Sequence, residues 1–237
     1  MTSPGVEFGS LLLFDGLLAL LTSFIVIKKD FNSPINRLVS GSLFLFGIYF
    51  IPEGLIYVLP LDFDYLFNPL LYITLCAAVA ASTTIAFAGL YTWHGGDFVR
   101  RPLVIASLLT IMVFAFVGVV IDSEMVYDPV NDLLAIDGGA IYLISLFGTT
   151  FVFLGLAFYG FFSTLKSVPP TDPLYNKILF FCLAIGLIII GLTYYSVLEA
   201  VARREGFFGI IGHLFYTGAS VIMIYAFKGS AEVVSDI

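Results

Sequence analysis

Four ionisable side chains interrupt stretches of the sequence that are otherwise apolar: Asp15, Glu53, Glu199 and His213. Asp15 comes seven residues into its apolar stretch, which corresponds to about 10 Å of helix. A charged group at membrane depth costs about 2.5–3.5 kcal/mol or more, and such groups usually serve binding or ion handling. All four positions fall in the outer half of the predicted membrane segments, so they are candidates for one site.

Tyrosines accompany three of these ionisable residues at helical spacing. Tyr49 precedes Glu53 by four residues, and Tyr195 precedes Glu199 by four. Tyr216 follows His213 by three. Residues three or four apart share one helix face. We therefore expect one ligand-binding pocket, open to the outside, that is lined by Asp15, Tyr49, Glu53, Tyr195, Glu199, His213 and Tyr216.

A proline interrupts the second apolar stretch next to one of the candidates. Pro52 precedes Glu53, and Gly54 follows it. A proline inside a helix removes one backbone hydrogen bond and kinks the helix. Such a break at membrane depth is tolerated where it faces protein or a wet cavity, which favours the pocket. In the alternative, structural interpretation, Asp15 only bonds a tyrosine of the next helix and Glu199 lies in interfacial water.

The remaining chemistry-bearing residues favour neither catalysis nor a cofactor. The two histidines, His94 and His213, fall near opposite membrane faces, whereas a zinc site would need three ligands together. Neither His-Glu-x-x-His nor Gly-x-Ser-x-Gly occurs. Lys228 lies too near the cytoplasmic edge to hold retinal, and Cys76 and Cys182 fit packing positions. We expect no enzyme activity, no metal and no cofactor.

The composition determines the elements that must position these residues. Of 237 residues, 60% are hydrophobic and 11% are charged, and the mean hydropathy is +1.06. About 20 apolar residues make one spanning helix. We predict a single all-α, multi-pass domain over residues 1–237, a bundle of seven transmembrane helices with a short tail at 228–237. The helices are expected at about 8–27, 38–59, 69–93, 103–121, 139–162, 178–198 and 207–227.

The basic residues predict the orientation of the chain. Of the ten Lys and Arg residues, eight fall in the first, third and fifth connections or after the last helix. Only Arg203 and Arg204 fall on the other side. Cytoplasmic loops are enriched in Lys and Arg. The N-terminus is therefore expected outside, the C-terminus in the cytoplasm, and the protein in the cell membrane.

The connection at 122–138 is acidic, because it holds five carboxylates and no basic residue. It lacks the Asp-x-Asp-x-Asp-Gly pattern of a common calcium loop. We expect a solvated loop, with a calcium site as the alternative. The net charge of −7 argues against nucleic acid as a partner.

Small residues indicate where helices approach closely. The run at 77–82 is Ala-Ala-Val-Ala-Ala-Ser. The fifth and sixth predicted helices contain the glycines Gly148, Gly155, Gly186 and Gly191. Small side chains let membrane helices pack backbone to backbone. These positions predict helix contacts.

One family resemblance covers most of the chain. It rests on Lys28-Lys29 at a helix end, on Asn-Ser-Pro-Ile-Asn-Arg at 32–37, on Tyr49 and Glu53, and on Gly-Ala-Ile-Tyr at 139–142. In these motifs, helix number and orientation, the chain resembles the seven-helix N-terminal sensor region of prokaryotic histidine kinases. The resemblance implies sensing coupled to a cytoplasmic output. Because residues 229–237 leave no room for a kinase, the output is expected from a separate partner.

Three functions remain open at this stage. The first is a non-catalytic sensor or receptor-like protein with a cytoplasmic or membrane protein partner. The second is a structural or accessory subunit of a larger membrane complex. The third is a small transporter or channel, which we rank last because few polar residues lie in the inner halves of the helices.

Overall fold

The protein is described from a computed structural model that covers residues 4–128, 133–201 and 207–228, without the side chains at 4–5, 128, 133, 135, 195–201, 207–210 and 228. Six helices of this part are long and apolar enough to cross a membrane: Val6–Lys29, Pro34–Val58, Leu61–His94, Pro102–Ile121, Ala140–Ser167 and Pro173–Tyr194. They confirm a mainly helical protein suited to several membrane crossings. A shorter apolar helix covers Ile211–Phe227, so the seventh crossing and the orientation stay predictions.

The described elements follow one another as a series of long helices with one short hairpin. They are α1 (Pro4–Lys29), α2 (Pro34–Val58), the 3-10 helix η1 (Leu61–Leu66), α3 (Phe67–His94), α4 (Gly96–Val99), α5 (Pro102–Ile121), β1 (Ser123–Asp128), β2 (Leu133–Gly138), α6 (Ala140–Leu143), the π-helix η2 (Ile144–Gly148), α7 (Thr149–Ser167), α8 (Pro173–Val201) and α9 (Phe207–Lys228).

Several helices extend beyond the apolar segments predicted for them. The helices α2, α5 and α8 begin at Pro34, Pro102 and Pro173. Proline suits a first helical turn, where its missing N–H would have no helical partner. In α2 the Ser33 Oγ also accepts a hydrogen bond from the Asn36 N–H at 3.4 Å. These prolines and the Ser33 cap let the helices begin before the apolar segments, in the more polar residues that precede them.

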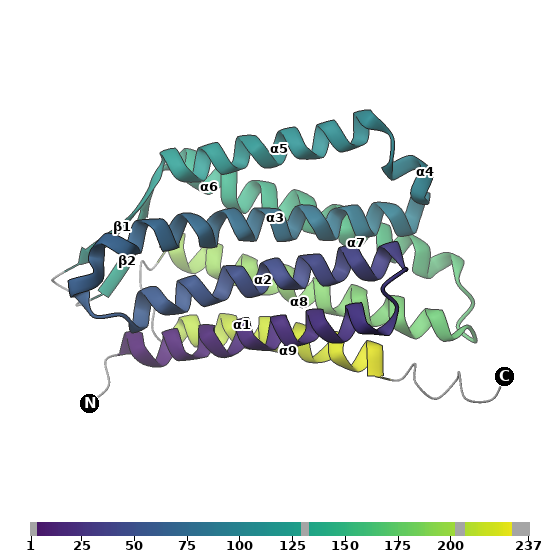
Figure 1. Cartoon of the computed structure of the whole chain (residues 1–237), viewed down its shortest axis with the longest axis horizontal. Helices are drawn as coiled ribbons and strands as arrows, with labels where there is room; N and C mark the ends of the chain where they lie inside the picture. The colour runs from purple at the N-terminus through teal and green to yellow at the C-terminus, as the bar shows by residue number, and fades with distance from the viewer. Residues whose placement is uncertain (1–3, 129–132, 202–206, 229–237) are drawn as a thin grey trace.

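Six of the long helices form a closed ring. Each helix contacts the next in the order α1, α2, α3, α7, α8 and α9, and α9 also contacts α1. The fourth predicted segment, α5, lies outside this ring and packs mainly on α3, as Figure 1 shows at the top of the view. The expectation that the first, second, sixth and seventh helices neighbour one another agrees with the contacts α1–α2, α8–α9 and α1–α9.

The acidic connection, expected to be a solvated loop, forms a β-hairpin that packs on the helices. Strands β1 and β2 pair antiparallel, with Ser123 opposite Gly138 and Met125 opposite Ile136. Met125 and Ile136 pack against a buried apolar cluster at this end of the bundle. The Asn68 Oδ1 accepts a hydrogen bond from the Met125 N–H at 2.7 Å. The hairpin therefore has an apolar side that rests on the helices, which an entirely solvated loop would lack.

Glycines bring α1 and α2 into backbone contact at two levels. A Cβ placed on Gly54 would lie 2.8 Å from the Gly9 carbonyl oxygen, and one on Gly9 would lie 2.7 Å from the Gly54 carbonyl oxygen. Two turns away, a Cβ on Gly47 would lie 3.2 Å from the Gly16 carbonyl oxygen and 2.6 Å from the Leu20 side chain. The Ser23 Oγ and Ser40 Oγ each donate to the other's backbone oxygen, at 2.9 and 3.0 Å. Small residues thus set the spacing of this helix pair.

The predicted small flank of α3 does make a helix contact. The Ser42 Oγ of α2 donates to the Ala81 carbonyl at 2.8 Å. On its other side α3 approaches α7, where a Cβ on Gly89 would lie 2.6 Å from the Ala157 Cα. Gly155 is different, because nothing lies within 4 Å of its Cβ position. The expectation of a close contact at Gly155 is therefore wrong.

We predict that Gly54→Ala lowers the free energy of unfolding by about 1–3 kcal/mol, because the new methyl group collides with the backbone of α1. Gly155→Ala, in open space on α7, is the matched control and should change stability by less than about 1 kcal/mol. Unfolding of the purified protein in mild detergent measures both values. Equal stability of the two variants would contradict the close α1–α2 packing.

Candidate functional site

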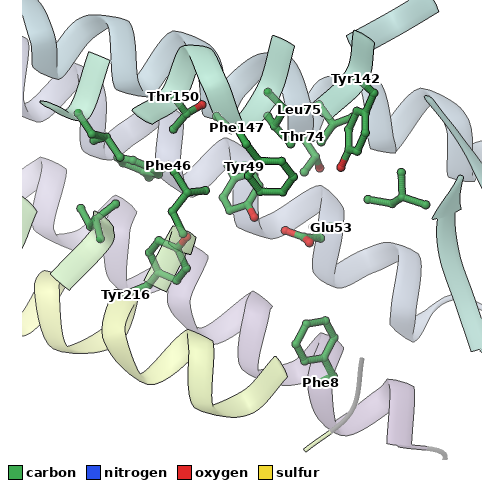
Figure 2. A pocket seen from close by; sticks show the side chains of 16 residues that line it. Phe8, Phe46, Tyr49, Glu53, Thr74, Leu75, Tyr142, Phe147, Thr150 and Tyr216 are labelled. Carbon is green, nitrogen blue, oxygen red and sulfur yellow. The ribbon is translucent and has the colours of Figure 1, made fainter. Parts of the chain in front are cut away.

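A cavity of about 80 Å³ lies between the ring helices at the level of the hairpin, whose residue Ile136 lines it. Its walls come from all six ring helices, from β2 and from the segment α6–η2, and Figure 2 shows the lining side chains. The lining residues are Phe8, Phe46, Tyr49, Glu53, Thr74, Leu75, Ala78, Ile136, Tyr142, Leu146, Phe147, Thr150, Leu154, Ile188, Leu192 and Tyr216. Helix α5 contributes no described residue to this wall.

The second helix supplies the charged group of the cavity. Glu53 and Tyr49 lie one turn apart on α2, and both line the cavity. Pro52 stands inside the same helix. A proline at this position frees a backbone carbonyl one turn earlier. The sequence analysis predicted that this break faces a cavity, and the structure places its neighbour Glu53 on the cavity wall.

A second helix irregularity borders the same space. The residues Ile144–Gly148 form a π-helical turn between α6 and α7. Leu146 and Phe147 of this turn line the cavity, with Tyr142 before it and Thr150 after it. Such π-turns widen a helix by one residue and occur often at functional sites. Two helix irregularities therefore meet at one cavity.

Two threonine hydroxyls on the cavity wall have no hydrogen-bond partner among the described residues. They are the Oγ1 atoms of Thr74 on α3 and Thr150 on α7. Thr74 is 1% exposed and Thr150 is 5% exposed. Burying a hydroxyl without a partner costs about 1–3 kcal/mol. The cavity thus offers two polar groups that a bound molecule can satisfy.

At the end of the bundle that carries the hairpin, strand β2 and the helix α6 border the cavity. Ile136 of β2 lines the cavity. The Asp122 Oδ2 accepts a hydrogen bond from the Tyr142 N–H at 2.9 Å. This bond caps the first turn of α6 and holds Tyr142 against the cavity wall. One acidic residue of the connection therefore has a structural role near the site.

Asp15 and His213 do not line the cavity, contrary to prediction, but form a buried clamp beside it. The His213 Nδ1 lies 3.1 Å from the Asp15 Oδ2. The Thr217 Oγ1 donates to the Asp15 Oδ1 at 2.5 Å. Asp15 is 2% exposed and His213 is 1% exposed. The structural alternative expected a tyrosine partner for Asp15, and the partners are instead a histidine and a threonine of α9.

Aromatic rings connect this clamp to the cavity. The His213 ring packs edge-on against Phe8 and Phe50, with centroids 5.1 and 5.6 Å apart. Phe50 in turn packs against Tyr216 at 5.4 Å. Phe8 and Tyr216 line the cavity. The clamp is therefore separated from the cavity by a single layer of rings.

The seven predicted site residues have three different outcomes. Tyr49, Glu53 and Tyr216 lie together on the cavity wall. Asp15 and His213 lie behind it, and the side chains of Tyr195 and Glu199 lie outside the described residues. The sequence analysis missed Thr74, Thr150 and most of the aromatic wall, because hydroxyls and rings are common in membrane helices and their spacing carries no signal. Of the aromatic residues that were missed, Tyr142 belongs to the quoted motif Gly-Ala-Ile-Tyr at 139–142.

Toward the basic end, a smaller cavity of about 10 Å³ follows the first. The two share Phe46, Ile188 and Tyr216 as a common wall. The other lining residues of the small cavity are apolar except Ser220. No described charged residue lines the small cavity, so the polar wall of the large cavity does not continue toward the basic end. In the same described part, no group of three His, Cys, Asp or Glu residues could hold a metal ion.

No protein-family model matches the chain, and no curated protein has a significantly similar sequence. The resemblance to histidine-kinase sensor regions therefore stays an expectation from the motifs quoted above.

We predict that His213→Phe lowers the free energy of unfolding by about 3–5 kcal/mol, because it leaves the buried Asp15 carboxylate without its main partner. Adding Asp15→Asn should restore most of the loss, since an amide is neutral and still accepts from Thr217. Denaturation of the two single variants and the double variant measures the coupling. Additive losses would contradict a direct Asp15–His213 interaction.

We predict opposite effects for two buried threonines of α3. Thr74→Val should raise the stability of the ligand-free protein by about 1 kcal/mol, because it removes a buried hydroxyl without a partner. Thr83→Val is the matched control: Thr83 is equally buried, but its Oγ1 donates to the Val79 carbonyl at 2.8 Å. It should lower stability by about 0.5–1.5 kcal/mol. Losses in both variants would mean that Thr74 is bonded in the folded protein.

Proposed function

We propose that this chain is a non-catalytic membrane sensor that binds a small ligand in the Glu53 cavity and passes the bound state to a protein partner in the cytoplasm. The observation that carries the proposal is a cavity between apolar helices whose wall carries the Glu53 carboxylate and the buried hydroxyls of Thr74 and Thr150, which have no hydrogen-bond partner among the described residues. Such polar groups at membrane depth destabilise a fold that makes no use of them.

The position of the cavity supports signalling across the membrane. Ring helices on every side contribute lining residues, so a bound molecule contacts several helices at once. Many of these helices continue to the opposite end of the bundle, where the α1–α2, α3–α5 and α7–α8 connections lie together (Figure 1). Lys28, Arg37, Arg100 and Lys166 belong to that end, which is the expected cytoplasmic side. Ligand binding at one end can therefore shift the helix positions that a partner contacts at the other.

The small second cavity favours a sensor over a transporter. A transport path needs polar groups or water throughout the membrane. Here the space beyond Phe46 and Tyr216 shrinks to about 10 Å³, with mainly apolar walls. A ligand that enters from the hairpin end therefore meets a closed floor.

The proposal predicts that solutes reach the cavity from the outside only. In a Cys76→Ala, Cys182→Ala background, Thr150→Cys should react in sealed vesicles with a membrane-impermeant methanethiosulfonate, applied as the cationic or the anionic reagent. Reaction is expected from the side that carries an N-terminal tag. Gly155→Cys on the open face of α7 is the control and should stay unreactive, since thiols in lipid do not ionise.

The other outcomes separate the alternatives. A Thr150→Cys thiol that reacts from neither side would overturn a ligand-binding cavity. Reaction from both sides would indicate a transporter or channel. Tags at the two chain ends that report from the same compartment would refute the predicted orientation.

A further inference from the structure

The basic end of the bundle carries exposed aromatic rings beside exposed cations. We propose that this surface retains anionic phospholipids of the adjacent leaflet through their headgroup phosphates. We call it the interfacial patch, and it consists of Trp93, His94, Arg101, Tyr159, Phe162 and Lys166. None of these residues lines the Glu53 cavity, so the inference goes beyond the function proposed above and does not depend on it.

A run of ring contacts connects α3, α4 and α7 in the interfacial patch. The centroid of the Trp93 ring lies 3.8 Å from that of His94 and 4.8 Å from that of Tyr159. The His94 ring in turn lies 4.4 Å from the Phe98 ring. On α7, Phe162 follows Tyr159 by three residues, so both rings share one helix face. The patch is therefore one surface that three helices build together.

A cation lies over a ring at each side of this run. The Lys166 Nζ lies 4.6 Å from the centroid of the Phe162 ring, and the Arg101 Cζ lies 5.4 Å from that of Phe98. Lys166 follows Phe162 by four residues, so its side chain runs back along α7 toward the membrane. Arg101 directly precedes Pro102, where a spanning segment begins. Both cations are therefore held at the membrane boundary, where lipid phosphates lie.

The rings of the patch face lipid and not water. Trp93 is 39% exposed, Tyr159 is 54% exposed and Phe162 is 39% exposed. Trp93 belongs to the spanning segment Leu61–His94, and the other two belong to Ala140–Ser167. Trp and Tyr side chains favour the headgroup boundary of a membrane. An exposed ring on a spanning helix is reached by a lipid of the same leaflet, whereas a protein dissolved in water does not reach it.

The cations of the patch are available to an anion. Neither Arg101 nor Lys166 forms an ion pair with a carboxylate of the described residues. The connections at 28–37, 95–101 and 166–177 together hold seven Lys and Arg residues and only three Asp residues. A phosphate accepts strong charge-assisted hydrogen bonds from Lys and Arg. An anionic phospholipid therefore matches both parts of the patch, with its phosphate at the cations and its acyl chains along the rings.

The single tryptophan of the chain makes the patch directly observable, because that tryptophan is Trp93. The whole chain is placed in phosphatidylcholine nanodiscs that contain a rising share of brominated phosphatidylglycerol or of brominated phosphatidylcholine. Bromine on a lipid chain quenches the fluorescence of a tryptophan that it contacts. Phosphatidylglycerol is expected to reach half of the maximal quenching at a severalfold lower share, because Lys and Arg attract anionic lipids. Concentrated salt should reduce this preference, and equal quenching by the two lipids would overturn the proposal.

Variants assign the lipid preference to the patch. Arg101→Gln combined with Lys166→Gln should remove the preference for phosphatidylglycerol. Lys29→Gln combined with Arg37→Gln is the matched control, because it removes the same charge from exposed positions beside the α1–α2 connection. The control should keep the preference. An equal loss in both double variants would refute a specific patch, and the melting temperatures show whether each variant is folded.

Two soluble competitors test the choice of a lipid as the occupant. Glycerol phosphate carries the headgroup phosphate without acyl chains, and poly-glutamate represents an acidic protein. Neither should remove the quenching preference at matched ionic strength. Removal by glycerol phosphate would assign the patch to free phosphate, and removal by poly-glutamate would assign it to an acidic protein, so either result would overturn the proposal. The Thr150→Cys reaction tests the cavity separately, so the proposed function stands if the lipid preference fails.

Discussion

Hydrocarbon offers no hydrogen-bond partners, so every ionisable side chain inside this bundle depends on other side chains for its partners. The Asp15 carboxylate illustrates the constraint most clearly. It is almost fully buried on α1, and its partners, His213 and Thr217, both lie on α9. This interaction joins the first and last described helices, and it closes the ring that encloses the cavity. The cavity could not exist in the same form if these two helices separated.

The same bundle combines closely packed helix pairs with one polar cavity between the helices. Glycines bring α1 against α2 and α3 against α7 until their backbones touch. The cavity lies beside Pro52 of α2, whose neighbour Glu53 lines it, and beside the π-helical turn Ile144–Gly148. The open space collects Glu53 and the hydroxyls of Thr74 and Thr150. A tightly packed frame with one polar defect suits a binding site, because the frame transmits any shift of the helices that line the defect.

Much of the architecture followed from composition and periodicity alone. Helical character, the membrane as solvent and the approximate helix positions were predictable, because a spanning helix needs a long apolar run whatever its neighbours are. The hairpin was missed although it carries a strand signal. Met125 on one strand and Leu134 and Ile136 on the other are apolar at alternate or paired positions and pack on the helices. The surrounding carboxylates concealed that pattern.

The sequence by itself determined which residues had to be buried or paired, and only the tertiary structure decided which of them share a space. Depth along a helix is readable from the sequence, since each residue adds a constant rise. The rotation of each helix and the choice of its neighbours are not, because they depend on side chains from several helices at once. Tyr49, Glu53 and Tyr216 therefore meet at the cavity as their depth suggested. Asp15 and His213, at similar depth, turn toward each other instead, because a carboxylate and an imidazole in an apolar interior are most stable as a pair.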